Sequence, residues 1–151
     1  MSDDAARREE NQRLYERMIK AQNAKDREGF LACFDDASVF EAPYYRPDAP
    51  IAAGKAAMGS MFGTLCEKFS SIDYQIKRLI PALDPDLVIA EVGGNNAVAG
   101  SDRVYRNDYL FLVNISDGLI TRIFEYSNPN VYARDVNGDL PGAVVTKLEE
   151  T

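Results

Sequence analysis

The stretch from Arg103 to Pro129, RVYRNDYLFLVNISDGLITRIFEYSNP, indicates the fold more directly than any other part of the chain. An Asp-Gly pair at 117–118 separates two runs rich in β-branched and aromatic residues, which is typical of two antiparallel strands joined by a tight turn. The charged side chains that interrupt these strands include Arg106, Asp108 and Glu125. Charged groups in a strand lie either on its wet face or in a pocket. The function depends on which of the two applies.

Length and composition restrict the classes of protein that need to be considered. A chain of 151 residues, 46% hydrophobic and 27% charged, is typical of one globular domain. Its formal net charge of -7 argues against nucleic acid or an anionic membrane as a partner. No apolar run approaches the roughly 18 residues of a membrane span, and the polar N-terminus resembles neither a signal nor a transit peptide. We therefore expect a cytoplasmic protein.

The chain contains no histidine. This excludes Ser-His and Cys-His catalysis and most transition-metal sites, and the sequence has neither a P-loop nor a dinucleotide-binding glycine motif. We therefore predict that the protein needs no metal and no cofactor, so that elemental analysis of the purified chain finds no stoichiometric metal. Cys33 and Cys66 lie in apolar helical stretches, and we predict two buried thiols rather than a disulfide.

Hydrophobic periodicity predicts helices first and antiparallel strands afterwards. The expected order is helix 10–25, short helix 26–34, strand 38–44, helix 54–69, strand 71–80, strand 87–98 and the hairpin. Segregated helices and hairpin-linked strands indicate an α+β fold. A curved antiparallel sheet with three helices packed on one face would enclose a cone-shaped pocket. We expect a single domain over 1–151, with an ordered core at about 10–137 and polar termini.

Two sets of residues suggest a family. The first comprises residues 22–26 (QNAKD), 29–30 (GF) and 34–39 (FDDASV), followed by Pro43. The second runs from Asn107 to Pro129. The chain resembles the superfamily of nuclear transport factor 2, ketosteroid isomerase and the SnoaL-like polyketide cyclases, and its second set is closest to the phenazine-biosynthesis PhzA/PhzB proteins. Ala42 and Met18 stand where ketosteroid isomerases have their catalytic Asp and Tyr, so the resemblance does not imply that activity.

The resemblance also implies site residues. The R-x-D motif of the limonene-epoxide hydrolases matches Arg106 to Asp108, and their second Asp falls near Glu125, where PhzA/PhzB have a pocket Glu. Glu125, Asp108 and Arg106 are therefore the predicted catalytic residues. The predicted ligand-binding residues are Tyr44 (beside Tyr45 at the pocket mouth), Met58, Phe62 and Tyr15. From the residues alone, either Thr121, Ile123 and Glu125 or Ile120, Arg122, Phe124 and Tyr126 face inward.

These expectations favour a cofactor-free SnoaL-like enzyme. Its pocket carboxylates would carry out a cyclisation, isomerisation, condensation or hydration. The substrate would be a hydrophobic small molecule, either cyclic or open-chain. One alternative is a module of the same fold that binds a ligand or partner without chemistry. A second alternative is an epoxide hydrolase like the limonene-epoxide hydrolases. The aromatic face formed by Tyr105, Tyr109 and Phe111 is predicted to join two subunits of a homodimer through the outer sheet face.

Overall fold

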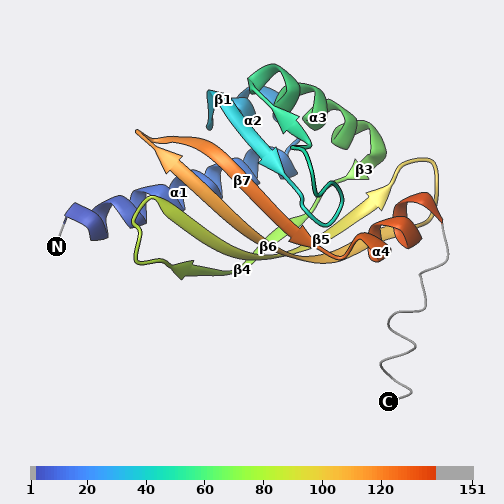
Figure 1. The fold of residues 1–151 in the computed structure, drawn as a ribbon. Coiled ribbons are helices and arrows are strands. Elements are labelled where there is room, and N and C mark those ends of the chain that lie inside the picture. The colour runs from blue at the N-terminus through green and yellow to red at the C-terminus, as the bar shows by residue number, and fades with distance from the viewer. Residues whose placement is uncertain (1–2, 139–151) are drawn as a thin grey trace, which may run out of the picture.

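The computed structural model describes residues 3–138, in which one strongly curved sheet carries helices on one face (Figure 1). The helices are α1 (Asp3–Asn23), α2 (Arg27–Leu31), α3 (Lys55–Lys68) and α4 (Pro129–Tyr132), which continues into the short π-helix η1 (Ala133–Asn137). The strands are β1 (Phe34–Glu41), β2 (Ala52–Ala53), β3 (Phe69–Ser71), β4 (Tyr74–Pro81), β5 (Leu87–Val98), β6 (Val104–Ser116) and β7 (Leu119–Ser127). The predicted tail after Gly138 lies outside the described residues.

The α+β fold class is confirmed. Neighbouring strands run in the order β2-β1-β7-β6-β5-β3, and β4 also pairs with β5. These pairs are antiparallel except for β1 and β7, which run parallel. The buried Ser38 hydroxyl donates a hydrogen bond to the Ile120 carbonyl and joins that parallel pair. Strand β1 begins at Phe34 rather than at position 38, so the second predicted helix is shorter than expected.

Helix α1 begins at Asp3, seven residues earlier than predicted, and its buried side chains recur every three or four positions. Both of its ends are tied to the sheet. Near the start, the Arg8 guanidinium donates to the carbonyls of Ala82 and Leu83 at 2.8 and 2.7 Å. At the end, the Asn23 side-chain amide exchanges two hydrogen bonds with the backbone of Tyr74, at 2.9 and 2.8 Å. These contacts hold α1 across the sheet (Figure 1).

The hairpin of β6 and β7 turns at Asp117 and Gly118, as predicted. Both residues have positive φ, 50° and 75°, the backbone of a two-residue turn that matches the twist of the strands. Next to the turn, Ile115 lies opposite Ile120, but Asn114 lies opposite Arg122.

Thr121 is therefore an extra residue in β7, a β-bulge, and its hydroxyl donates to the Asn114 carbonyl at 3.2 Å. Ile120 and Ile123 are consequently both buried although they are three residues apart. Beyond the bulge, Glu125 lies opposite Phe111. Directly opposed side chains in an antiparallel pair share a face, so Glu125 and Phe111 point to the same side of the sheet.

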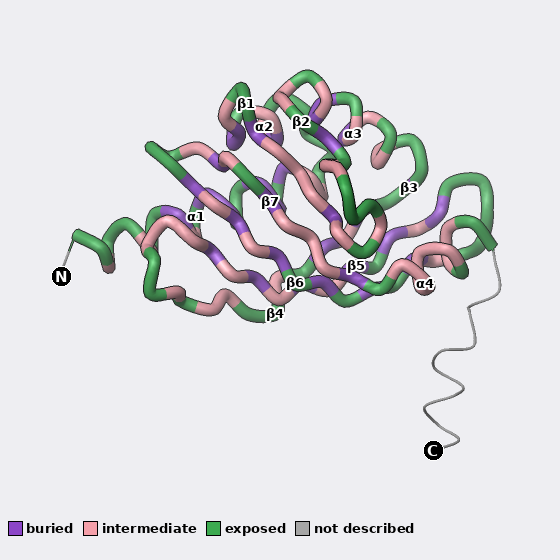
Figure 2. The backbone as a smooth tube through the Cα atoms, viewed as in Figure 1, coloured by how far each residue is buried: buried purple, intermediate pink, exposed green. Residues whose placement is uncertain are grey.

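Strand β6 alternates strictly between buried and exposed side chains over its central part (Figure 2). The core side of β6 carries Tyr105, Tyr109 and Phe111, which are 3%, 4% and 8% exposed. The prediction that these three residues form a subunit interface is therefore wrong. They pack beneath the helices, and Tyr15 of α1 contacts Phe111 with ring centroids 6.3 Å apart. Cys33 and Cys66 are free thiols as predicted, although only Cys33 is buried.

Candidate functional site

A cavity with two adjoining lobes lies between the helices and the inner face of the sheet. Its inner lobe, about 140 Å³, is mostly apolar, and its outer lobe is about 260 Å³. The inner lobe is walled by Met18, Ile19, Phe30, Met58, Met61 and Phe62, among others. The outer lobe is walled by Tyr45, Phe69, Tyr105, Tyr109 and Tyr132, among others. Phe40, Leu65, Tyr74 and Glu125 line both lobes.

Glu125 reaches this junction because of its place in β7. Ser127 follows two residues later on the same face, and its hydroxyl donates to Glu125 Oε1 at 2.9 Å. Tyr45, in the loop between β1 and β2, has its hydroxyl 3.2 Å from Ser127 Oγ. A serine hydroxyl has one proton, so when Ser127 donates to the carboxylate it can accept from Tyr45. Tyr45, Ser127 and Glu125 then form a chain of hydrogen bonds.

The environment of Glu125 alters its acidity. Burial raises the pKa of its carboxyl from 4.5 to about 7, and the hydrogen bond from Ser127 opposes this rise without cancelling it. Among the described residues that line either lobe, none is a lysine or an arginine. No cationic side chain in that lining therefore stabilises the ionised form. A carboxyl with a pKa near neutrality can both accept and release a proton under physiological conditions.

Neutral hydroxyl groups surround this carboxyl. Burial, with a further contribution from the Glu125 carboxylate, raises the pKa of Tyr15, Tyr74 and Tyr109 well above the usual value. These phenols therefore keep their protons and can act as hydrogen-bond donors. The buried hydroxyls of Tyr15 and Tyr109 have no hydrogen-bond partner within residues 3–138. Because an unpaired buried hydroxyl is unfavourable, that of Tyr109, whose ring lines the outer lobe, would gain from a guest that brings an acceptor.

Arg106 and Asp108 do not lie in this cavity. They occupy the outer face of β6, where the Asp108 side chain is 82% exposed and pairs with Lys77 at 2.5 Å. Arg106 donates from Nε to Asn95 Oδ1 at 3.2 Å. The prediction that both would meet Glu125 in one pocket is wrong. The bulge at Thr121 places Glu125 on the face of the odd-numbered residues of β6, opposite to theirs.

The predicted ligand-binding residues divide in the same way. Met58 and Phe62 line the inner lobe, and their role in ligand binding stays a prediction. Tyr15 is fully buried but does not line either lobe. The prediction for Tyr44 is wrong: it is 64% exposed and packs edge-on against Tyr126, with ring centroids 5.5 Å apart. The chain turns sharply after Ala42, which sends Tyr44 outward and Tyr45 into the outer lobe.

Sequence reasoning missed several residues that line the outer lobe or support its carboxyl: Ser127, Tyr74, Tyr105, Tyr109 and Tyr132. A signal for two of them was present, because Tyr105 and Tyr109 alternate on one side of a strand that carries charged residues on its other side. The same pattern is also compatible with a subunit contact, which is the prediction that the burial of both rings contradicts. No local pattern indicated Tyr132, which lies at the end of the short helix α4.

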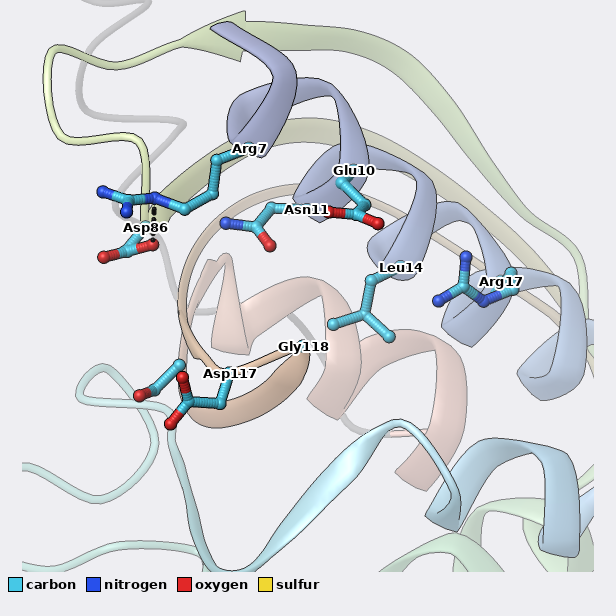
Figure 3. Close-up of a pocket in the computed structure, with 9 residues that line it drawn as sticks. Arg7, Glu10, Asn11, Leu14, Arg17, Asp86, Asp117 and Gly118 are labelled. Atoms are coloured by element: carbon cyan, nitrogen blue, oxygen red, sulfur yellow. Dashed lines mark ion pairs between the residues drawn. The ribbon is translucent and has the colours of Figure 1, made fainter. Parts of the chain in front are cut away.

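A second hollow, about 480 Å³, lies between α1 and the β6–β7 turn (Figure 3). Arg7 and Asp86 form an ion pair across it at 3.1 Å, and both side chains are about half exposed. The Asn11 amide beside them donates to the Pro85 carbonyl at 2.9 Å, which ties the helix to the β4–β5 turn. Its polar groups thus serve structural contacts, and the cavity around Glu125 is the stronger candidate site.

Neither a metal centre nor a membrane span is found in the part of the chain that the structure describes. No group of three or more Cys, Asp or Glu side chains there is arranged to hold a metal ion. Over the same residues, no helix is both long and apolar enough to cross a membrane.

The model of the SnoaL-like domain family matches residues 15–123. The chain belongs to the SnoaL-like domain family. The uncharacterized protein YesE of Bacillus subtilis (strain 168) is 27% identical over 115 residues, which cover 76% of this chain and 78% of YesE. The family match includes α2, α3 and most of the strands that form the cavity, so the resemblance inferred from the sequence motifs is confirmed.

Two solved structures of known assignment share the fold. A phenazine biosynthesis-related protein of Pseudomonas aeruginosa (phzb2) superposes with a TM-score of 0.78 at 20% identity, over 94% of this chain and 90% of that chain. The Δ5-3-ketosteroid isomerase of a Mycobacterium species superposes with a TM-score of 0.72 at 21% identity, over 81% of this chain and 95% of the isomerase. At these identities the similarities establish a shared fold and no shared chemistry.

Proposed function

We propose that this SnoaL-like protein is a cofactor-free enzyme in which Glu125 moves a proton on a hydrophobic, uncharged or cationic small molecule. The observation that carries the proposal is the position of Glu125 at the junction of an apolar lobe and a tyrosine-walled lobe. A cavity of this kind excludes water from the reacting atoms and leaves one group able to exchange a proton at neutral pH.

The simplest reaction that fits is proton transfer next to a carbonyl group. Ionised Glu125 would take a proton from the carbon beside the carbonyl, and the electron pair of the broken C–H bond would delocalise onto the carbonyl oxygen. A tyrosine hydroxyl such as that of Tyr109 would donate a hydrogen bond to this oxyanion. Return of the same proton to another carbon of the delocalised enolate completes an isomerisation. Alternatively, the enolate carbon attacks a second carbonyl carbon of the same substrate: a C–C bond forms, the C=O π bond breaks, and the resulting alkoxide takes the proton from Glu125, which gives a cyclisation. Neither outcome requires a redox partner.

Hydrogen–deuterium exchange tests this proposal without knowledge of the natural substrate. A panel of cyclic ketones and enones is incubated with the protein in deuterium oxide, and loss of the α-proton signals is followed by NMR. We expect Glu125→Gln to slow protein-catalysed exchange by about 10²–10⁴-fold, the usual contribution of a general base. Asp108→Asn is the matched control, since it neutralises an exposed carboxylate on the other face of the sheet. Equal exchange in wild type and Glu125→Gln would contradict the proposal.

A binding module without chemistry is the second candidate function. It is favoured by the location of Arg106 and Asp108, because no second carboxyl lines the cavity within the described residues. Ligand binding without exchange of any panel member would support this alternative. An epoxide hydrolase of the predicted kind needs two carboxylates and an arginine in one pocket. Because Arg106 and Asp108 lie on the outer face, the described residues do not bring that set together. The cytoplasmic location expected from the sequence stays a prediction.

We also propose a homodimer through the outer sheet face, formed by different residues from those first predicted. Leu110 is 41% exposed there, and Phe124 stacks on Tyr126 with centroids 6.5 Å apart. Exposed apolar side chains gathered on one face favour association. Sedimentation equilibrium should show a dimer that Leu110→Asp dissociates and Leu83→Asp, in the β4–β5 turn, does not. A wild-type chain that sediments at 16.8 kDa would contradict this assembly.

A further inference from the structure

Four tyrosine rings that line the outer lobe contact one another edge to face. Tyr105 is inclined by 83° to Tyr109, with centroids 6.5 Å apart, and by 86° to Tyr132 at 5.4 Å. Tyr132 is in turn inclined by 89° to Tyr45 at 5.8 Å. These four differently oriented rings form a tyrosine box around the lobe, and Phe69, which also lines it, stacks on Tyr105 with an interplanar angle of 14°. All four rings line the same 260 Å³ space.

The charge in this box has one sign. The face of an aromatic ring is the negative end of its quadrupole, and the Glu125 carboxyl adds a full negative charge whenever it is ionised. Within the described lining of both lobes there is no lysine or arginine to offset it. The field in the lobe therefore attracts a cation and opposes an anion. A neutral guest gains from burial and from hydrogen bonds to the tyrosine hydroxyls, but not from this field.

The rim already shows such an interaction. The ammonium group of Lys68, at the end of α3, lies 5.3 Å from the centroid of the Tyr132 ring and donates to its hydroxyl at 2.6 Å. Lys68 is exposed and does not line the lobe, so it leaves the box itself without a cation. Beyond Glu125 the cavity continues into the apolar inner lobe, which suits a hydrocarbon substituent.

We propose that the outer lobe binds an organic ammonium group, protonated or quaternary, whose apolar substituent enters the inner lobe. A desolvated cation above several tyrosine rings gains cation–π attraction, and the carboxylate at the junction supplies the opposite charge. This recognition does not depend on Glu125 transferring a proton. It therefore goes beyond the proposed catalysis, and either one can fail without the other.

Three soluble probes of the same branched shape but different charge test the proposal. Choline carries a trimethylammonium group, 3,3-dimethylbutan-1-ol replaces that nitrogen with carbon, and 3,3-dimethylbutanoate is an anion. Affinities are measured by calorimetry and by NMR titration. We expect choline to bind at least about tenfold more tightly than the alcohol, and the anion to bind most weakly. The proposal is overturned if the alcohol binds as tightly as choline, or if no choline binding is detected.

The pH dependence of choline binding supplies an independent readout. With a pKa of about 7, the Glu125 carboxyl in the lining changes charge near neutrality, whereas burial raises the pKa of the tyrosines beside it, Tyr45, Tyr74, Tyr105 and Tyr109, above the usual value. Affinity should therefore rise about tenfold between pH of about 6 and about 8, as the free carboxyl ionises, while binding of the alcohol stays constant. Choline affinity that is flat across this range would contradict a role for Glu125.

Variants distinguish the contribution of the carboxylate to choline binding from that of the rings. Glu125→Gln and Tyr132→Leu should each weaken choline binding about tenfold and leave the alcohol unchanged, because Leu keeps apolar volume without an aromatic face. Tyr132 is partly exposed on α4, which makes its replacement tolerable for folding. Tyr126→Leu on the outer face is the control and should bind choline like the wild type. Unchanged choline affinity in both cavity variants would overturn the proposal. Selective choline binding without deuterium exchange would instead count only against the proposed catalysis.

Discussion

Polar side chains on the two faces of strand β6 lie in opposite environments, one hydrated and one buried. On the outer face, Asp108 pairs with Lys77 in water, and Arg106 reaches Asn95. On the inner face, the carboxyl of Glu125, from the neighbouring strand, has a hydroxyl partner but no cationic one in its described surroundings. The outer charges remain hydrated, and such ion pairs contribute little to stability. The inner carboxyl loses hydration on ionisation, which raises its pKa to about 7.

This contrast shows why the number of charges in a strand is a weak guide to a site. Of the three charged residues that the sequence predicts for the site, Arg106 and Asp108 lie on the surface. The third, Glu125, is the chemically useful group. It lies where ionisation is unfavourable, and that environment brings its pKa close to neutral pH. The following variants test the contrast between the faces.

The largest expected effect concerns packing. Phe111 is 8% exposed and stacks on Tyr109, with ring centroids 5.5 Å apart. Phe111→Ala should lower the free energy of unfolding by about 3–5 kcal/mol, because it removes a buried ring and leaves a cavity. Arg106→Ala, on the outer face of the same strand, should change it by less than about 0.5 kcal/mol. Urea denaturation measures both, and equal losses would contradict the assignment of the two faces.

The second effect is the pH dependence of stability. Glu125 titrates at 4.5 when unperturbed and at about 7 in the folded protein, so between these values the folded state holds the extra proton. Stability should therefore fall as pH rises through this window, by up to about 3 kcal/mol from this group. Glu125→Gln should remove that slope, whereas Asp108→Asn should retain it. Identical slopes in wild type and Glu125→Gln, measured by urea denaturation from pH of about 4.5 to about 8, would show that the carboxyl is not desolvated.

A smaller effect is expected from the hydrogen bond that Ser127 donates to Glu125. That bond favours the ionised carboxylate, so Ser127→Ala should raise the pKa of Glu125 further above its present value. The loss of one hydrogen bond to a charged group corresponds to about 1.5–3 kcal/mol. Tyr45→Phe, which leaves Ser127 in place, should shift the pKa less. An NMR titration of the labelled carboxyl carbon follows both variants, and a lowered pKa in Ser127→Ala would contradict the hydrogen-bond geometry.

The smallest effect is expected on the outer face. Lys77→Ala removes the partner of Asp108, yet both side chains are largely in water. We expect no measurable change in the unfolding midpoint and no change in deuterium exchange, because exposed ion pairs are screened and flexible. Thermal unfolding at low and high salt provides the measurement. A clear loss of stability that disappears at high salt would show that the outer charges contribute more than this comparison allows.

Much of the fold was accessible from the sequence because its signals are local. The Asp-Gly turn at 117–118, for example, rests on short-range backbone chemistry. The motifs around residues 22–39 indicated the family, and the family match confirms it. The inward placement of Met58 and Phe62 followed from helical spacing. The start of α1 was misplaced because its first turns are polar and are held by distant contacts such as Arg8 with Ala82.

The arrangement of the site depended on a feature that no local pattern shows. The sequence by itself determined an α+β domain, a hairpin and a carboxylate at position 125 within a strand. Without the extra residue Thr121, the register next to the turn would place Glu125 opposite Leu110, on the same face as Arg106 and Asp108. The bulge shifts the register by one residue, and a one-residue shift exchanges the faces of every later side chain. Only the packing of the whole sheet against the helices selects that register, because it buries Ile120, Ile123 and the tyrosines of β6 together.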